Sequence, residues 1–321
     1  MGVETRYHPS SEQLALASTI GESLAVVLPR SRLRTEHDED AKVWSSLDEI
    51  GVFGIGVSEE QGGSALGAVE EALIVMALGR LLAAPSVLAT IGAAHAQSEK
   101  SAITIHGRRV ASGYRSGERV VVVGDANVDL VLVRDHDAAA VYETTSGGTN
   151  AIDNRLWLTR LREAANLHKP VARFDSTGLL RLRLIDAAAL AGMCEVALEM
   201  AVAYAGMREQ FGRPIGTFQA VKHHCANMAI AARCARDQTN FAAVAIDERR
   251  DDAALQVECA LFVAGSAALE NAAKNIQIHG GIGFSDEADP HLFIKRAQLH
   301  IAIAGGLEAA NRRVANTKAG W

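Results

Sequence analysis

Two short segments of the chain combine cationic or amide side chains with glycine-rich backbone. The first, Arg208 to Gln219, reads REQFGRPIGTFQ, and the second, Gln277 to Phe284, reads QIHGGIGF. A guanidinium group pairs with pyrophosphate oxygens through forked hydrogen bonds. A helix start with closely packed glycine backbone adds N–H donors for the same anion. The two segments therefore predict a pyrophosphate-binding surface that does not use the G-x-G-x-x-G fingerprint of βαβ units.

The candidate binding residues are shared between these two segments. They are Arg208, Phe211, Gln219, Gln277, Gly280 and Gly281. A purely structural role is the alternative for each segment: Arg208 as a cation at a helix C-terminus, and Gly280–Gly281 as a simple turn. The occurrence of both segments about sixty residues apart favours the binding interpretation.

Composition limits the class of protein. The 321 residues are 49% hydrophobic and 22% charged, which is typical of a globular protein with an extended core. A net charge of −6 argues against general nucleic-acid binding. We expect no apolar run long enough to span a bilayer and no signal peptide at the N-terminus, so the predicted location is the cytoplasm. Dispersed histidines and unpaired cysteines predict no metal site.

The elements that must position these segments are predicted as three units. Residues 1–100 should form an N-terminal all-helical domain, with helices around residues 14–27, 44–52 and 66–81 and with Ser64 as a possible cap of the third. Residues 101–186 should form a reduced middle β domain of short antiparallel strands, including 102–105 and the alternating run Leu180–Leu184.

The remaining residues, 187–321, are predicted to form a C-terminal four-helix bundle. Apolar residues recur with helical spacing from Ala187 onward, and Asp186 is a plausible cap for the first of the four helices. Asp251 or Asp252 should cap the third, and Asp289-Pro290 should begin the fourth. Both glycine-rich segments then lie between helices of this bundle.

The order of these units and the motifs together resemble the acyl-CoA dehydrogenase family. Arg208-x-x-Phe211-Gly212 with Phe218-Gln219 resembles one family signature, and Gln277-x-x-Gly280-Gly281-x-Gly283 resembles another. The sequence from Glu59 to Gly63 looks like a third, N-terminal motif of the family. The resemblance implies a mainly α fold with a small β domain. It also implies FAD as cofactor, whose ADP half the arginine and both glutamines bind across a subunit interface.

The chain departs from the family where the catalytic base is expected. The resemblance implies a glutamate that removes the α-proton of an acyl thioester, at a position that falls here at Gly305 or, in other members, near Leu182. Glu308 and Asp186 are the nearest carboxylates, and three or four residues of displacement move a side chain by about one helical turn. Glu308 is the weak candidate. The middle domain is also expected to be shortened between His95 and Val120, where family members hold the flavin ring.

These departures favour a subunit that completes the FAD site of a partner. The family resemblance is to the short subunits without a base in heteromeric α2β2 acyl-CoA dehydrogenases, which take part in α,β-dehydrogenation of an acyl-CoA thioester in lipid or steroid catabolism. Expected partners are a full-length acyl-CoA dehydrogenase subunit, in a dimer or tetramer, and an electron acceptor such as an electron-transfer flavoprotein. Two alternatives remain: a self-sufficient homo-oligomer with a relocated base, and a non-catalytic scaffold. The sequence does not specify the acyl group.

Overall fold

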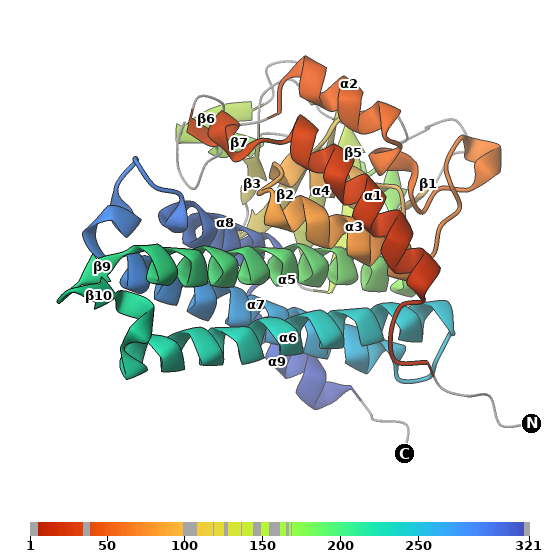
Figure 1. Cartoon of the computed structure of the whole chain (residues 1–321). Helices are drawn as coiled ribbons and strands as arrows, with labels where there is room; N and C mark the ends of the chain where they lie inside the picture. The colour runs from red at the N-terminus through yellow and green to blue at the C-terminus, as the bar shows by residue number, and fades with distance from the viewer. Residues whose placement is uncertain are drawn as a thin grey trace, which may run out of the picture.

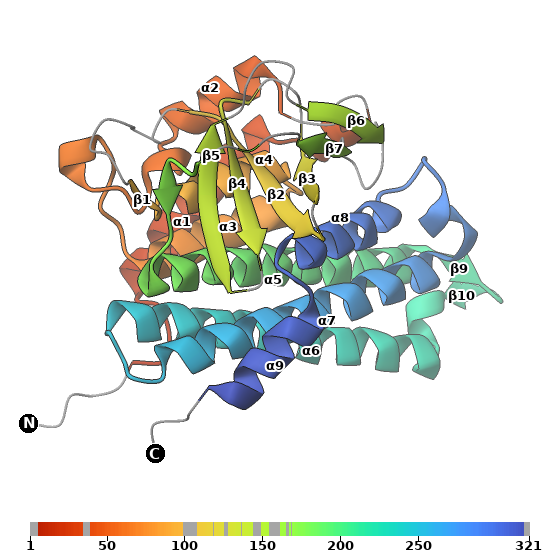
Figure 2. The same ribbon diagram turned by 180° about the vertical axis from the view of Figure 1, so that it is seen from behind.

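A computed structural model shows how these segments are arranged. It describes residues 6–34, 39–98, 108–117, 119–124, 128–135, 137–143, 149–153, 161–164, 167 and 169–317. A layer of N-terminal helices and a small sheet lie together on one side of a bundle of long helices (Figures 1 and 2).

The N-terminal helices are α1 (Ser11–Val27), α2 (Ala41–Glu49), α3 (Ala68–Arg80) and α4 (Pro85–Ala93), with short 3-10 turns between the first three. The first three confirm the predicted helices. Ser64 is not the cap of α3, because the carboxylate of Asp247 from the bundle accepts hydrogen bonds from the backbone N–H groups of Ala68 and Val69, at 2.6 and 3.0 Å. A carboxylate at a helix N-terminus also interacts favourably with the helix dipole. This cap ties the N-terminal layer to the bundle.

The sheet is small and mostly antiparallel, as predicted. Its described strands run in the order β1-β8-β5-β4-β2-β3-β7-β6. Their bounds are β1 Gln97–Ser98, β2 Val110–Ser116, β3 Arg119–Val123, β4 Leu130–Asp135, β5 Ala138–Glu143, β6 Thr149–Asp153, β7 Leu161–Ala164 and β8 Ala172–Arg173. One neighbouring pair, β2 and β4, is parallel, which corrects the all-antiparallel expectation. The predicted strand at 102–105 lies outside the described residues.

The bundle is built from α5 (Ser176–Met207), α6 (Gln219–Asp247), α7 (Ala253–His279) and α8 (Pro290–Ile303), followed by a shorter α9 (Leu307–Asn316). The predicted four-helix bundle is confirmed, and Pro290 occupies the first turn of α8 as expected. Asp252 is the N-cap residue of α7, but its side chain makes no capping hydrogen bond; it pairs with Arg250 instead, at 2.9 Å.

The start of the bundle differs from the prediction. Leu180–Leu184 is not a strand, because α5 already begins at Ser176 with Asp175 as its N-cap. The alternation of leucine and arginine misled the interpretation, since Arg181 and Arg183 are not solvated but pair with Glu71 and Glu258, at 3.0 and 2.6 Å. When leucines alternate with ion-paired arginines that lie inside the protein, a helix has the same sequence pattern as a strand with one solvent-exposed face. We therefore propose a domain boundary at Asp175 rather than at 186; the boundary expected at 100 lies outside the described residues.

The N-terminal layer and the bundle share one core. α3 crosses α5 so closely that a Cβ atom on Gly192 would lie 2.0 Å from the carbonyl oxygen of Met76. Only glycine fits at such a crossing. The apolar cluster on both sides of this contact extends from Leu24 of α1 to Phe293 of α8, so the two units form a continuous hydrophobic interior.

Helix α7 has the composition of a core helix. The stretch Ala253–Phe284 has a mean hydropathy of 1.3 in its most apolar window, enough for a membrane-crossing helix by length and composition, and half of that window is buried inside the protein. The expectation that no apolar stretch reaches this length is therefore wrong for α7. Its packing against α5, α6 and α8 (Figures 1 and 2) accounts for its apolar composition.

Candidate functional site

The first glycine-containing segment forms a hairpin at one end of the bundle. Strands β9 (Glu209–Gln210) and β10 (Arg213–Pro214) pair around a two-residue turn at Phe211 and Gly212. Both turn residues have positive φ angles, +54° for Phe211 and +75° for Gly212, as a type I′ turn requires. This backbone conformation is unfavourable for a bulky side chain, and strained residues of this kind concentrate at functional sites. The Phe211 side chain is 92% exposed.

Arg208 is the residue that precedes this hairpin, at the C-cap of α5. Its backbone N–H donates to the carbonyl of Tyr204, at 2.8 Å, but its exposed guanidinium group has no hydrogen-bond or ion-pair partner among the residues that the structure describes. The neighbouring Arg213 differs, because its guanidinium lies over the Phe218 ring at 4.3 Å from the ring centroid. Gln219 is exposed at the start of α6. Arg208 therefore offers an unused set of N–H donors.

The second segment lies at the end of α7. Gly280 has a φ of +65° and reverses the chain, and Gly281 is exposed, with open space where a Cβ atom would lie. The exposed amide of Gln277 accepts a hydrogen bond from Lys274 at 2.9 Å, which leaves its NH2 group without a partner among the described residues. A 3-10 turn over Gly280–Phe284 then leads to α8.

The structure brings the two segments to the same end of the bundle. In both views the β9–β10 hairpin and the turn before α8 lie at that end (Figures 1 and 2). The rings of Tyr204 on α5 and His279 on α7 stack with their centroids 4.1 Å apart. A small apolar cluster that includes Ala205, Met228 and Ile278 packs beneath them. Two segments about sixty residues apart therefore form one surface.

We call this surface the bundle-end surface and define it by the six predicted residues together with the exposed apolar side chains beside them. These side chains are Met207, Phe211, Ile282 and Phe284. Exposed apolar groups next to cationic and amide donors are typical of a surface that another molecule covers. The arrangement can hold an anion that arrives from outside, because the donors lie on an open edge rather than in a cavity of this chain.

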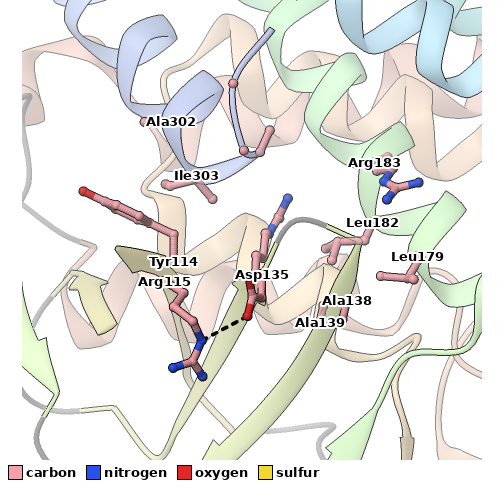
Figure 3. Close-up of a pocket in the computed structure, with 14 residues that line it drawn as sticks. Tyr114, Arg115, Asp135, Ala138, Ala139, Leu179, Leu182, Arg183, Ala302 and Ile303 are labelled. Carbon is pink, nitrogen blue, oxygen red and sulfur yellow. Dashed lines mark ion pairs between the residues drawn. The ribbon is translucent and has the colours of Figure 1, made fainter. Parts of the chain in front are cut away.

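A separate cavity of about 290 Å³ lies between the sheet and the bundle (Figure 3). It is lined by residues from β2, β4, β5 and α5, by the end of α8 and by the residues that follow α8. Leu182 and Gly305, the two positions at which the sequence pattern placed a catalytic carboxylate, both line it. Two positions far apart in the sequence thus meet in one cavity.

The carboxylates proposed as substitutes do not line this cavity. The side chain of Glu308 is 84% exposed on α9 and pairs with Arg312 at 2.7 Å. Asp186 is not a helix cap but lies buried within α5, in an ion pair with Arg134 of β4. Burial raises the pKa of Asp186 above its ordinary value, while Arg134 and Arg183 act in the opposite direction.

Sequence analysis missed the charged groups of the cavity wall. Arg134, Arg183 and the exposed pair Arg115–Asp135, with a distance of 3.1 Å, line the cavity. Arg134-Asp135 ends an apolar strand, a position at which polar side chains commonly mark a site, and this signal could have identified it. Arg183 also pairs with the buried carboxylate of Glu258, as the neighbouring Arg181 does with that of Glu71.

His300 lies behind this wall and is fully buried. Burial, with Arg296 and Arg134 nearby, lowers the pKa of His300 to about 3. The imidazole is therefore neutral in the folded protein at neutral pH, and its Nε2 atom has no partner among the described residues.

The pH dependence of stability tests this assignment. Because the unfolded chain binds a proton at His300 near pH 6.5 and the folded chain does not, the unfolding free energy should fall as pH drops below 6.5, by at most about 1.4 kcal/mol per pH unit from this residue. Measured by urea unfolding between pH 7 and pH 5, the unfolding free energy of His300→Phe should fall less steeply with decreasing pH than that of the wild-type protein. His223→Phe, which alters an exposed histidine of α6, should not; equal slopes for all three proteins would contradict the assignment.

Among the described residues, no group of three His, Cys, Asp or Glu side chains is placed to hold a metal ion.

Comparison with known proteins identifies related domains and folds. Residues 10–108 match the family model of the acyl-CoA dehydrogenase N-terminal domain, and residues 173–318 match that of the acyl-CoA dehydrogenase C-terminal domain. The chain is 30% identical to the acyl-CoA dehydrogenase IpdE2 of Mycobacterium tuberculosis, with 88% of each chain aligned. It is 33% identical to the acyl-CoA dehydrogenase FadE34 of the same organism over 87% of this chain, but it spans only 42% of that relative's length.

Solved structures with the same fold include a two-component assembly. A chain of the ChsE4-ChsE5 complex from Mycobacterium tuberculosis superposes with a TM-score of 0.76 at 22% identity, covering 98% of this chain and 100% of that one. A chain of the Tcur3481-Tcur3483 steroid ACAD, a G363A variant, gives a TM-score of 0.76 at 20% identity, with 95% and 97% coverage.

Proposed function

Because the chain belongs to the acyl-CoA dehydrogenase family, a family of FAD-dependent oxidoreductases, we propose that it completes the FAD site of a catalytic partner subunit. The observation that carries this proposal is the bundle-end surface, where Arg208, Gln219 and Gln277 present unused donors on an open edge. Because these donors lie on an open edge of the bundle, the anion that they bind should belong to a neighbouring subunit.

The bundle-end surface fits the ADP half of FAD. Arg208 would pair with pyrophosphate oxygens through two parallel hydrogen bonds. The amides of Gln219 and Gln277 would donate to further oxygens, and the open backbone at Gly280 and Gly281 would let the pyrophosphate approach closely. Phe211, held outward by its left-handed backbone, offers an apolar face to the cofactor. When bound, FAD supplies the acceptor for the hydride that leaves the β-carbon of the acyl thioester.

The cavity between the sheet and the bundle fits FAD poorly. A volume of about 290 Å³ is at the lower limit for pockets that enclose even drug-sized ligands, and FAD joins a flavin to a full ADP group. Arg134, which is ion-paired with the buried Asp186, lines the cavity and narrows the space for a ligand. We infer that FAD binds in the site formed with the partner subunit and that the cavity of this chain holds no second flavin.

Among the described residues, none of the positions derived from the sequence carries a side chain suited to remove the α-proton, and Asp135, the carboxylate that lines the cavity, pairs with Arg115 at 3.1 Å. A general base must reach within about 3 Å of the proton that it removes. Gly305 has no side chain, Leu182 has an apolar one, and Glu308 is turned to solvent. Asp186 is buried and held by Arg134. The proton acceptor for α,β-dehydrogenation would therefore come from the partner subunit.

The comparisons support a heteromeric assembly. One similar chain belongs to a complex of two named components. The relative FadE34 extends well beyond the part that this chain matches, and its remaining length is sufficient for a second unit of similar size. We propose a full-length acyl-CoA dehydrogenase as partner, in a dimer or tetramer, with an acyl-CoA substrate from lipid or steroid catabolism. The electrons would pass to an acceptor such as an electron-transfer flavoprotein, in the cytoplasm.

Visible absorption spectra test this function. The chain purified alone should be colourless, whereas the complex with an acyl-CoA dehydrogenase homologue encoded beside it should show flavin bands and be bleached by an acyl-CoA substrate. If the chain alone were yellow and turned over substrate, the self-sufficient alternative would hold. If no complex with an encoded homologue contained flavin, the scaffold alternative would hold.

A further inference from the structure

We propose that the cavity between the sheet and the bundle binds a short aliphatic monocarboxylate, with about four to six carbons. This site is separate from the bundle-end surface and does not depend on FAD sharing. Figure 3 shows the cavity with side chains from the sheet on one side and from α5 and the end of α8 on the other.

The polar part of the wall consists mainly of arginines. Arg115, Arg134 and Arg183 line the cavity, against Asp135 as the one carboxylate among the described lining residues. Two of these arginines are held from behind by buried carboxylates: Arg134 by Asp186, and Arg183 by Glu258 at 2.6 Å. A guanidinium group fixed in this way loses little freedom when it binds an anion.

The arginines still have donors to offer. A guanidinium carries five N–H donors, and the ion pair with Asp186 uses only the Nη1 atom of Arg134. The Nη2 atom of Arg134 forms no hydrogen bond to another described residue, and a carboxylate in the cavity, which Arg134 lines, would accept one from it. Because Asp135, Asp137, Asp186 and Glu258 balance the positive charges of the three arginines and of the adjacent Arg313, binding should depend on these directed hydrogen bonds rather than on net charge.

The remaining wall selects for an aliphatic group. Leu179, Leu182 and Ile303 line the cavity together with alanines of β5 and α8. These side chains cannot hydrogen-bond to the additional oxygens of phosphate or sulfate, but they pack well against methylene groups. A volume of about 290 Å³ corresponds to roughly ten non-hydrogen atoms, at about 30 Å³ for each water-sized group. A chain of four to six carbons, carboxylate included, fits within this space.

Calorimetric titration with pentanoate tests the site in the full-length chain. We expect saturable binding with a Kd on the order of 1 mM, as ligand efficiency allows for so small a molecule. Pentanamide has the same shape without the charge and should bind at least about tenfold more weakly, because it loses the charge-assisted hydrogen bonds. Inorganic phosphate should not bind in this range. No saturable heat with pentanoate, equal binding of pentanamide, or equal binding of phosphate would each overturn the proposal.

A matched pair of variants locates the binding. The double variant Arg134→Met/Asp186→Leu removes the guanidinium without leaving its buried partner charged, a replacement that proteins often tolerate; it should weaken pentanoate binding about tenfold or more. Arg119→Ala removes an exposed arginine of β3 that does not line the cavity and should leave binding unchanged. If the double variant fails to fold, Ala139→Leu, which fills the cavity from β5, should abolish binding instead. Unchanged binding in the folded double variant or in Ala139→Leu would overturn the proposal.

The binding of pentanoate should be independent of flavin binding. Pentanoate should leave the flavin content of the complex with the partner unchanged, because the two sites lie on different parts of the chain. Release of flavin by pentanoate would place the flavin in this cavity and overturn the assignment of two separate sites.

Discussion

Arg208→Ala is expected to remove most of the FAD from the complex of this chain with its partner. Truncating one member of a hydrogen-bonded charge pair at an interface costs about 2–5 kcal/mol, which corresponds to a loss of affinity of roughly thirtyfold or more. The variant should still fold, because the guanidinium of Arg208 has no partner among the described residues. The measurement is the dissociation constant of FAD from the reconstituted complex, followed by flavin fluorescence.

Two further variants make this test specific. Arg208→Lys keeps the charge but loses the forked geometry, so its effect should lie between those of the wild-type protein and Arg208→Ala. Arg233→Ala removes an exposed arginine of α6 that pairs with Asp237 and should leave FAD affinity unchanged. If Arg208→Ala formed the complex and bound FAD as tightly as Arg233→Ala, the assignment of the bundle-end surface would be wrong.

Glu71→Ala is expected to destabilise the chain by about 3–5 kcal/mol, because removing one partner of a buried ionic cluster leaves the others uncompensated. Glu71 of α3 is fully buried and accepts from Arg181 of α5 at 3.0 Å and pairs with His95 at 2.7 Å. Gly56 packs against this cluster so closely that a Cβ atom there would lie 2.7 Å from the ring of His95. Urea unfolding at pH 7 measures the loss.

The pH dependence gives this prediction a second readout. Burial by itself would raise the pKa of Glu71, but His95 and Arg181 lower it below its ordinary value of 4.5. The carboxylate therefore contributes stability that is fully present above pH 4.5 and is lost as the pH falls through its lowered pKa. The difference between the wild-type protein and Glu71→Ala should shrink in acid. Glu70→Ala, on the same helix but partly exposed, should cost less than about 1 kcal/mol at any pH; similar losses for both variants would contradict the cluster's role.

Local patterns predicted most helices because each has its own signals. The apolar spacing of α1 and α2, and the proline that begins α8, act within one or two turns of chain and need no tertiary information. The same reasoning failed for Leu180–Leu184, where the partners that make two arginines compatible with a buried helix come from Glu71 and Glu258, more than seventy residues away. The cap of α3 was missed for the same reason, since Asp247 belongs to α6.

The two candidate sites also differ in how far their residues could be predicted from the sequence. The candidate residues of the bundle-end surface are close together within two short segments, so they could be selected from their types and spacing, although the contact of Tyr204 with His279 that joins the segments could not. The cavity combines Arg134 of β4 with Arg183 of α5 and with Gly305 after α8. No short segment contains such a combination, and only the packing of the sheet on the bundle creates it.

Counting FAD in complexes of known subunit composition tests the central claim most directly. The chain alone should contain no FAD, and the complex with its partner should contain one FAD for each pair of unlike subunits, measured by extracting flavin from protein of known mass. One FAD per chain in a preparation that contains this chain alone would contradict the account.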